Sequence, residues 1–538
     1  MSRRAVALVV LALLLVGGIV LSRGDGATTA GDVDDSTLVA VEPANLLPVG
    51  PPDDALDGAW YCAGQSSGEG TVADGTLVLA NVGTDDARAR VTATSSDGEE
   101  AEVDVDVAAL TTERLALADL IEAEWVAAAV HVVGGTITVE HEVVGPLGRD
   151  VAPCHSRSSD RWYLPAGAST RDATMALAVF NPHAGAATVD LSFTTDENVR
   201  EPNELQGMLV PAGGVVVVPV SDLVTEREVM ATTVTTRRGL VVVDRIQTFD
   251  GTGAATTAEE IEAQPFRRKG VTLTPAVAAP AEAWTFPASV SSNYTAERVV
   301  VFNPGERTAE FVIDVALDEQ ERYDPVPSVP LDVPGGRFAV FDVRDHEAIP
   351  SAAAHTLTVR SRNEVPILAE RSLSSVGEAP SLGEATSTGS PVEDTAWVLP
   401  AGPRPDGADD ARYVIDNPGA EAVEVTVSAF GDGTLEALPD GRLTIEAGRR
   451  VELRPDDLPP GRVSLLVEAS GPVVVERRLL SRTAAEVPGD DEPDEEDDAE
   501  AADDETEDTE EGSDDEAAGL GTSATIGIPL DRRLARLG

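Results

Sequence analysis

The stretch Trp162-Tyr163-Leu164-Pro165-Ala166-Gly167, followed by Asn181-Pro182, recurs in altered form three more times along the chain. The other copies begin at Trp60, Trp284 and Trp397, and the asparagines that follow them are Asn81, Asn303 and Asn417. A motif that returns at intervals of roughly a hundred residues indicates a tandem array of similar units.

An acid directly followed by a base recurs in a β-rich run near the end of each copy. The four pairs are Glu140-His141, Asp244-Arg245, Glu370-Arg371 and Glu476-Arg477. Because neighbouring residues of a strand point to opposite faces, the acid and its adjacent base do not meet directly. We expect each to pair across its own sheet, as a structural contact rather than as a catalytic carboxylate.

The four tryptophans have two interpretations. Their rings could stack on sugars, or they could be buried at one end of each unit or at a junction with its neighbour. Aromatic residues make up only 4% of the chain, too few for an extended sugar-binding surface. We therefore expect a structural role for the four tryptophans, the four asparagines and the four acids.

The segments between these motifs are short β-branched runs separated by Gly, Pro and Asn, without a long amphipathic helical pattern. This pattern predicts an all-β chain, a tandem array of about four immunoglobulin-like antiparallel β-sandwich domains. Two hairpins are expected, one turning at Gly134-Gly135 and one at Ala469-Ser470-Gly471. The predicted repeats are residues 56–159, 160–280, 281–393 and 394–486.

The chain has 538 residues and a formal net charge of −56, which excludes a general nucleic-acid binder because phosphate would be repelled. Residues 487–520 consist mainly of Asp and Glu and are predicted to be a disordered acidic insertion, acting as a spacer or as a loose cation binder. Ser523 to Pro529 resembles the stretches that precede Trp284 and Trp397. We expect residues 521–538 to hold a terminal strand that returns to the fourth repeat, the alternative being an unrelated tail.

The N-terminus has membrane character. Arg3 and Arg4 precede an apolar run from Ala5 to Leu21, and Arg23 follows it. This favours an uncleaved single-pass transmembrane anchor at residues 1–22 over a cleaved signal peptide, which would give a secreted protein. Residues 23–55 are predicted to be a flexible stalk, with the acidic bulk outside the cytoplasm.

The two cysteines, Cys62 and Cys154, stand at the start and the end of the first repeat, and a disulfide between them suits an exported protein. The alternative is a pair of buried free thiols. No spacing typical of a metal site, a nucleophile elbow or a phosphate loop is present, and the six histidines are scattered. The sequence therefore nominates no catalytic, cofactor-binding or metal-binding residue, and we expect a protein that is not an enzyme.

The anchor, the Trp60-Tyr61-Cys62 start, Cys154 and the recurring Asn-Pro and Glu-Arg strands resemble an uncharacterised family of anchored or secreted actinobacterial proteins, known only as a domain of unknown function. The resemblance covers Leu56 to Arg478 and implies a location in the cell envelope, without site residues. The acidic insertion departs from the family's pattern.

Two hypotheses for function follow. The first is a non-enzymatic envelope protein that binds or scaffolds a cell-wall polysaccharide or another envelope protein. The second is an accessory or degenerate subunit of envelope glycan assembly.

Overall fold

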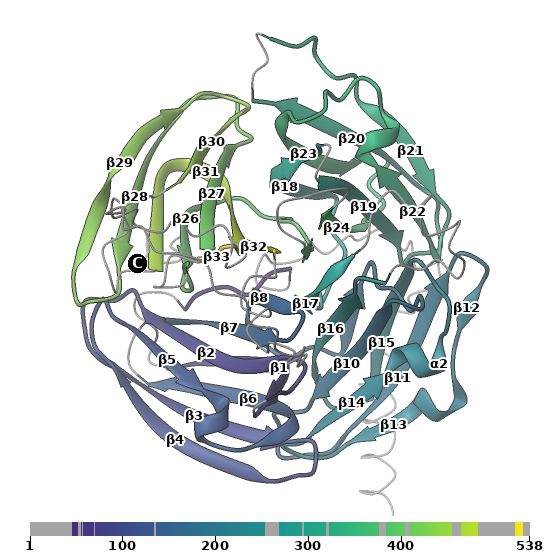
Figure 1. Ribbon diagram of the computed structural model, residues 1–538, viewed down its shortest axis with the longest axis vertical. Coiled ribbons are helices and arrows are strands. Elements are labelled where there is room, and N and C mark those ends of the chain that lie inside the picture. Colours follow the sequence, from purple (N-terminus) through teal and green to yellow (C-terminus); the bar gives the residue numbers. More distant parts are fainter. Residues whose placement is uncertain are drawn as a thin grey trace, which may run out of the picture. The chain divides into compact units, whose positions relative to one another are not determined.

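The computed structural model describes residues 46–51, 55, 57–68, 70–133, 136–252, 268–292, 295–318, 322–375, 383–403, 409–454, 464–481 and 522–530. These residues form strands, their connections and a few short helical turns, and the prediction of an all-β chain with antiparallel sheets is confirmed (Figure 1). The predicted membrane helix at 1–22 and the acidic insertion at 487–520 lie outside the described ranges. Within those ranges, no helix is long and apolar enough to cross a membrane.

Repeat 1 is a sandwich of two sheets that share one apolar core. One sheet has the order β4-β3-β6-β1, and in the other β2 pairs with β5 and β7, and β7 pairs with β8. A single parallel pair between Ser66 and Asp74 joins the sheets. The elements are β1 (Asp57–Ser67), β2 (Asp74–Asn81), β3 (Ala87–Ser95), β4 (Glu100–Val107), β5 (Thr112–Ala116), the 3-10 turn η2 (Leu117–Asp119), β6 (Ala123–Val133), β7 (Ile137–Gly145) and β8 (Gly148–Pro153).

Repeat 2 has the same two-sheet construction, with the orders β12-β11-β15-β9 and β14-β10-β16-β17, and β13 added beside β11. The elements are β9 (Arg161–Leu164), β10 (Ala173–Phe180), β11 (Ala187–Thr195), β12 (Val199–Arg200), η3 (Asn203–Leu205), β13 (Gln206–Val210), β14 (Val215–Pro219), the one-turn helix α2 (Val220–Leu223), β15 (Met230–Arg238), β16 (Val242–Asp250) and β17 (Lys269–Pro275).

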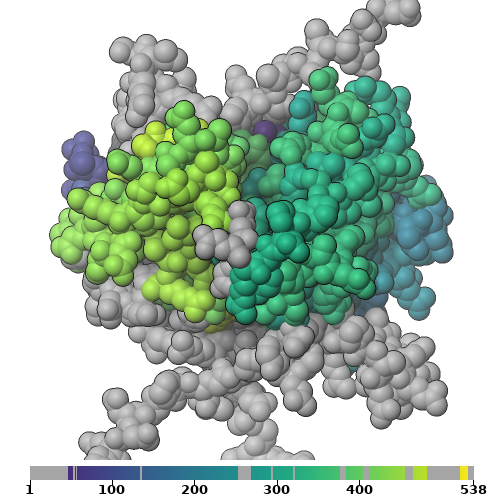
Figure 2. Space-filling model, turned by 90° about the horizontal axis from the view of Figure 1, so that it is seen from above, coloured from purple at the N-terminus to yellow at the C-terminus, as the bar shows by residue number. Residues whose placement is uncertain are grey.

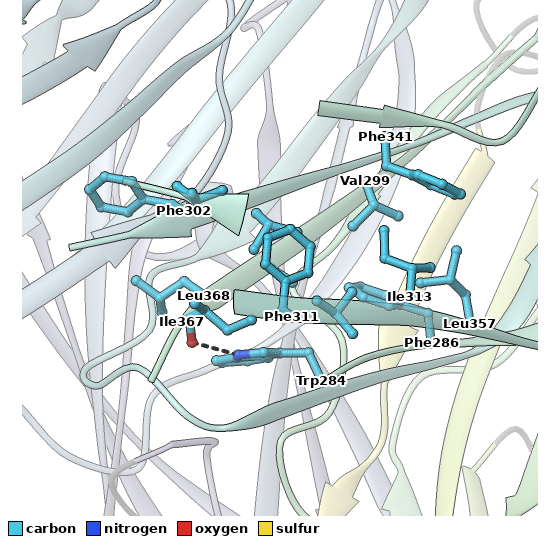
Figure 3. Close-up of a cluster of buried hydrophobic side chains, with 14 of the residues drawn as sticks. Trp284, Phe286, Val299, Phe302, Phe311, Ile313, Phe341, Leu357, Ile367 and Leu368 are labelled. Carbon is cyan, nitrogen blue, oxygen red and sulfur yellow. Dashed lines mark hydrogen bonds between the residues drawn. The ribbon is translucent and has the colours of Figure 1, made fainter. Parts of the chain in front are cut away.

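Repeat 3 consists of the sheets β18-β23-β20-β21 and β22-β19-β24-β25 around the core drawn in Figure 3. The elements are β18 (Ala283–Val290), β19 (Thr295–Asn303), β20 (Ala309–Leu317), β21 (Val329–Val333), β22 (Arg337–Asp342), η4 (Val343–Asp345), β23 (Ala354–Ser361), β24 (Leu368–Ser375) and β25 (Glu384–Ser387).

Repeat 4 differs because one long strand, β31, belongs to both of its sheets. The first sheet has the order β29-β28-β31-β26-β33, and in the second β27 pairs with β30 and β31, and β31 pairs with β32. The strands are β26 (Asp394–Leu399), β27 (Asp409–Asn417), β28 (Val423–Phe430), β29 (Leu435–Ile445), β30 (Arg449–Leu453), β31 (Ser464–Ser481), β32 (Thr522–Ile526) and β33 (Ile528–Pro529).

The two predicted hairpins are wrong. Among the described residues β6 pairs with β1 and β3, whereas β7 pairs with β2 and β8, so β6 and β7 do not pair with each other. In repeat 4 Leu465 to Glu468 pairs with β26, and Val474 to Ser481 pairs with β27. Two β-branched runs joined by glycine suit a sandwich corner as well as a hairpin, because both connections keep one face of each run in the core.

The strand β32 completes repeat 4. β32 pairs antiparallel with β31, as β8 pairs with β7, β17 with β16 and β25 with β24. Beyond it, the backbone nitrogen of Gly50 donates to the carbonyl of Pro529 at 2.9 Å. The chain therefore enters repeat 1 and leaves repeat 4 at adjoining positions.

Candidate functional site

Each repeated tryptophan is buried in the core of its own sandwich. The indole Nε1 of Trp284, which is 0% exposed, donates to the carbonyl of Ile367 at 2.7 Å (Figure 3). The other indoles donate in the same way, each to the carbonyl three residues before the acid of its own repeat: Trp60 to Ile137, Trp162 to Val241 and Trp397 to Val473. The tryptophans are thus not available to stack on a sugar.

Each repeated asparagine is also buried and joins two loops of its own repeat. The side-chain nitrogen of Asn417 donates to the carbonyls of Glu421, Ile445 and Glu446, and its oxygen accepts from the backbone nitrogen of Gly419. Asn81, Asn181 and Asn303 make the corresponding bonds in repeats 1, 2 and 3.

Each repeated acid points out of its own repeat and into the end of the preceding one. There it accepts a hydrogen bond from the backbone nitrogen of the alanine within the tryptophan motif. The bonds run from Ala63 to Asp244 at 2.7 Å, Ala166 to Glu370 at 3.1 Å, Ala288 to Glu476 at 2.7 Å and Ala401 to Glu140 at 2.7 Å. The tryptophan motif and the acid are therefore two halves of one contact between repeats.

The base of each repeat meets the acid of the next repeat, and the expected pairing across its own sheet is wrong. Nη2 of Arg245 lies 2.5 Å from Glu370, and Nη2 of Arg371 lies 2.5 Å from Glu476. Nη1 of Arg477, in the last repeat, lies 3.0 Å from Glu140 in the first. All these side chains are at most 1% exposed, so the four junctions form a closed series of buried contacts.

The junction between repeats 1 and 2 uses histidine where the others use arginine. Nε2 of His155 lies 2.8 Å from Asp244, and that of His141 lies 3.9 Å from the same carboxylate. Burial lowers the pKa of His141 to about 4, against the attraction of Asp244. Burial alone would raise the pKa of Asp244, but the charge and hydrogen bond of His155 hold it below the usual value. No spacing in the sequence indicates that the scattered residues His141 and His155 share Asp244 as a partner.

The predicted disulfide is confirmed. Cys62 and Cys154 are bonded with a Cα–Cα distance of 4.8 Å, and both are fully buried beside His141. The two sulfurs and a ring nitrogen of His141 lie within 4.8 Å of one another, but because the sulfurs are oxidised to a disulfide they cannot serve as thiolate ligands for a metal.

The four terminal strands β8, β17, β25 and β32 contact one another in turn, and β32 contacts β8. Two buried carboxyls lie on or beside them. Burial raises the pKa of Asp150 to about 7 although it accepts from the backbone nitrogens of Val151 and Leu273, and burial raises that of Glu384 to about 7. The cavity next to these strands, lined also by Leu46 to Pro48, has a volume of only about 40 Å³, room for little more than a water.

A larger and more polar cavity lies between repeats 3 and 4. Its volume is about 180 Å³, and it is lined by Ala316, Leu317, Asp318, Thr356, Asp416, Gly448, Arg449 and Arg450. Figure 2 shows the teal residues of repeat 3 and the green residues of repeat 4 side by side. Asp318, Asp416 and Arg450 do not belong to the recurring motifs, because their contacts occur at this junction.

One more buried pair distinguishes repeat 3. Nε2 of His355 lies 3.0 Å from Glu297, and both side chains are 0% exposed. By their pairing in the sheets, these residues occupy the positions of Met230 and Met175 in repeat 2. The exchange of two methionines for an acid and a base was visible only after the repeats had been aligned in space.

Comparisons with known proteins leave the function open. The model of a family of unknown function, DUF5719, matches residues 135–400. No curated protein matches. A crystal structure of Thermotoga maritima 1070 is similar at 19% identity and a TM-score of 0.18, over 20% of this chain and 93% of that one. The Streptomyces avermitilis α-L-rhamnosidase complexed with L-rhamnose has 12% identity and a TM-score of 0.10, over 81% of this chain and 57% of that one.

Proposed function

We propose that this chain is a non-enzymatic protein of the cell envelope, anchored in the membrane through its N-terminal residues, whose immunoglobulin-like repeats form one rigid body outside the cytoplasm. That body would bind or scaffold a cell-wall polysaccharide or another envelope protein. The observation that carries the proposal is the closed series of buried contacts, because it fixes all four repeats to one another.

Rigidity follows from the cost of separating any two repeats. Opening a junction such as that of Arg371 with Glu476 would expose two side chains that are buried and paired, together with the backbone nitrogen of Ala288. A rigid surface loses less conformational entropy on binding than a flexible string of domains, which favours a scaffold. The location outside the cytoplasm is supported by the disulfide, which persists in oxidising compartments, and by the arginine-flanked apolar run from Ala5 to Leu21.

The location is tested by fractionating cells and treating the membrane fraction with a maleimide reagent under denaturing conditions, with and without prior reduction. We expect the full-length chain in the membrane fraction, and modification of Cys62 and Cys154 only after reduction. The double variant C62A/C154A controls for the labelling. A chain found in the cytosol with two reactive thiols would contradict the proposal.

The scaffold role is tested by crosslinking in cells followed by purification of the chain. Recovery of wall polymer or of a stable envelope protein would support it. Recovery of glycan-assembly enzymes, with loss of their activity on deletion of the chain, would replace it by the role of an accessory subunit.

A further inference from the structure

The polar cavity between repeats 3 and 4 lies beside charged residues of repeat 4. The equivalent positions at the other junctions hold uncharged residues. By their pairing, Asp416 and Arg450 occupy the positions of Phe302 and Phe338 in repeat 3. The same positions hold Phe180 and Val215 in repeat 2, and Ala80 and Thr112 in repeat 1. Phe180 and Val215 pack into an apolar cluster with Ala63 and Ala129 of the preceding repeat. Repeat 4 thus replaces a pair of uncharged residues by an acid and a base, and leaves room of about 180 Å³ beside them.

Two of the charged residues that line this cavity, Arg450 and Asp318, already form hydrogen bonds with each other. Arg450, whose side chain is 3% exposed, donates from Nε and Nη2 to both carboxylate oxygens of Asp318. Its Nη1 donates to the carbonyls of Pro287 and His355. These contacts hold repeat 4 against repeat 3 and leave neither charge free for a ligand.

Asp416 is different because one of its oxygens is unused. The residue is 5% exposed, and Oδ1 accepts from the hydroxyl of Thr356 at 2.7 Å. No described residue donates to Oδ2, and Asp416 lines the cavity. Oδ2 is therefore available to accept a hydrogen bond from a group bound inside the cavity. Arg449, which also lines the cavity, is partly exposed, and within the described ranges its side chain makes one long hydrogen bond, at 3.5 Å, to the carbonyl of Asp318.

We propose that this cavity is a binding site for a small neutral polyol, which donates a hydroxyl to Asp416 and accepts from Arg449. The volume equals that of about six waters, enough for a compound with roughly as many non-hydrogen atoms. The proposal does not depend on the cellular location or on the scaffold role.

The charges of the lining disfavour the other classes of ligand. Asp318, Asp416, Arg449 and Arg450 sum to zero when Asp416 is ionised, so a neutral ligand leaves no buried charge uncompensated. A divalent cation needs six or more oxygens, and both oxygens of Asp318 are taken by Arg450. An anion would be repelled by Asp416 and would find only Arg449 available. Vicinal hydroxyls both donate and accept, as the remaining acid and base require.

The test is titration calorimetry of the full-length chain with glycerol and erythritol, with calcium chloride and sodium acetate as the competing classes. We expect at least one neutral compound to bind, and Asp416→Asn to weaken it by about tenfold or more, since a hydrogen bond to a charged group is lost. Arg449→Ala, at a partly exposed position, is the second variant and should weaken the same compound. Arg337→Ala is the matched control, because Arg337 makes the corresponding carbonyl contacts, with Thr195 and Glu197, at the junction of repeats 2 and 3.

Failure of every neutral compound to bind at high millimolar concentration would overturn the proposal, as would binding that neither Asp416→Asn nor Arg449→Ala weakens. Binding of calcium or acetate alone would also overturn it. Unfolding curves recorded for each variant separate a lost site from a lost fold. Because neither membrane fractionation nor crosslinking enters this test, its failure would leave the envelope role standing.

Discussion

The junction of repeats 2 and 3 and that of repeats 3 and 4 have one buried ion pair in common, here called the inner contact. They differ at a second pair of residues, here called the outer positions. The inner contact is an arginine on a buried glutamate, Arg245 with Glu370 and Arg371 with Glu476, at 2.5 Å in both. At the outer positions the first junction has Phe302 and Phe338. The second junction has Asp416 and Arg450 there, with a cavity beside them. The buried ion pair is therefore common to both junctions, whereas the charged outer positions and the cavity belong to the junction of repeats 3 and 4.

The largest effect on stability is expected when the arginine of the inner contact is removed at either junction. Arg245→Met and Arg371→Met should each lower the free energy of unfolding by about 3–5 kcal/mol, because each leaves a buried carboxylate unpaired. Denaturant unfolding at neutral pH measures the losses. Arg90→Met, which removes an ion pair with Asp104 on an exposed ladder, is the control and should cause no measurable loss. A loss at one junction but not at the other would show that the inner contacts are not equivalent.

The second prediction concerns the pH dependence of stability at the junction of repeats 2 and 3. There Gly270 of repeat 2 lies against the backbone of Glu384 of repeat 3. Because burial raises the pKa of Glu384 to about 7, the folded chain holds a proton that the unfolded chain releases near pH 4.5. Stability from this group is therefore present at acidic pH and lost as the pH rises from about 4.5 to 7. Glu384→Gln should be more stable than the native chain by up to about 3 kcal/mol at about pH 8, and equal to it at about pH 4. Parallel pH profiles for the two chains would refute this assignment.

The asparagines beside the outer positions allow a third comparison. Asn303 and Asn417 are both 0% exposed and donate to corresponding carbonyls, Val333 and Ile445 among them. Asn303→Ala and Asn417→Ala should each cost about 2 kcal/mol, since each leaves buried carbonyls without a donor. Thermal unfolding would measure this. Unequal costs would mean that the cavity has also altered the loops around Asn417.

The smallest effect is expected at Asp416 itself. Asp416→Ala loses the bond from Thr356 but removes a carboxyl whose pKa burial raises to about 6, so the free energy of unfolding should change by no more than about 1 kcal/mol at neutral pH. Alanine is already present at the corresponding position, Ala80, in repeat 1. A loss as large as that of Arg371→Met would make Asp416 a structural residue and weaken the case for a ligand.

Much of the fold could be predicted from the sequence because its decisive residues recur. Tryptophan, asparagine and the acid–base pair return in the same order four times, and each lies in the same place in its repeat. Strand patterns show that a run such as Ile137 to Gly145 is extended, but not which neighbour it pairs with. For that reason the sequence predicts a hairpin of β6 with β7, whereas in the structure the two strands pair with different partners.

The partners of the repeated charges could not be predicted, for a physical reason. Alternation along a strand shows that Asp244 and Arg245 face opposite ways. It does not show that Asp244 meets the preceding repeat, or that Arg245 meets the glutamate of the following one. The cavity was hidden as well, since Asp416 next to Asn417 reads as an ordinary polar strand end. Comparing the residue before each asparagine, Ala80, Phe180, Phe302 and Asp416, would have marked it as the exception.

The contact of Glu140 with Arg477 spans 337 positions of the chain, far more than the 125 between Arg245 and Glu370 or the 105 between Arg371 and Glu476. Bringing together the ends of so long a segment costs more entropy than joining consecutive repeats, so this junction is expected to form last. During synthesis Glu140 of the first repeat stays unpaired until Arg477 has been made.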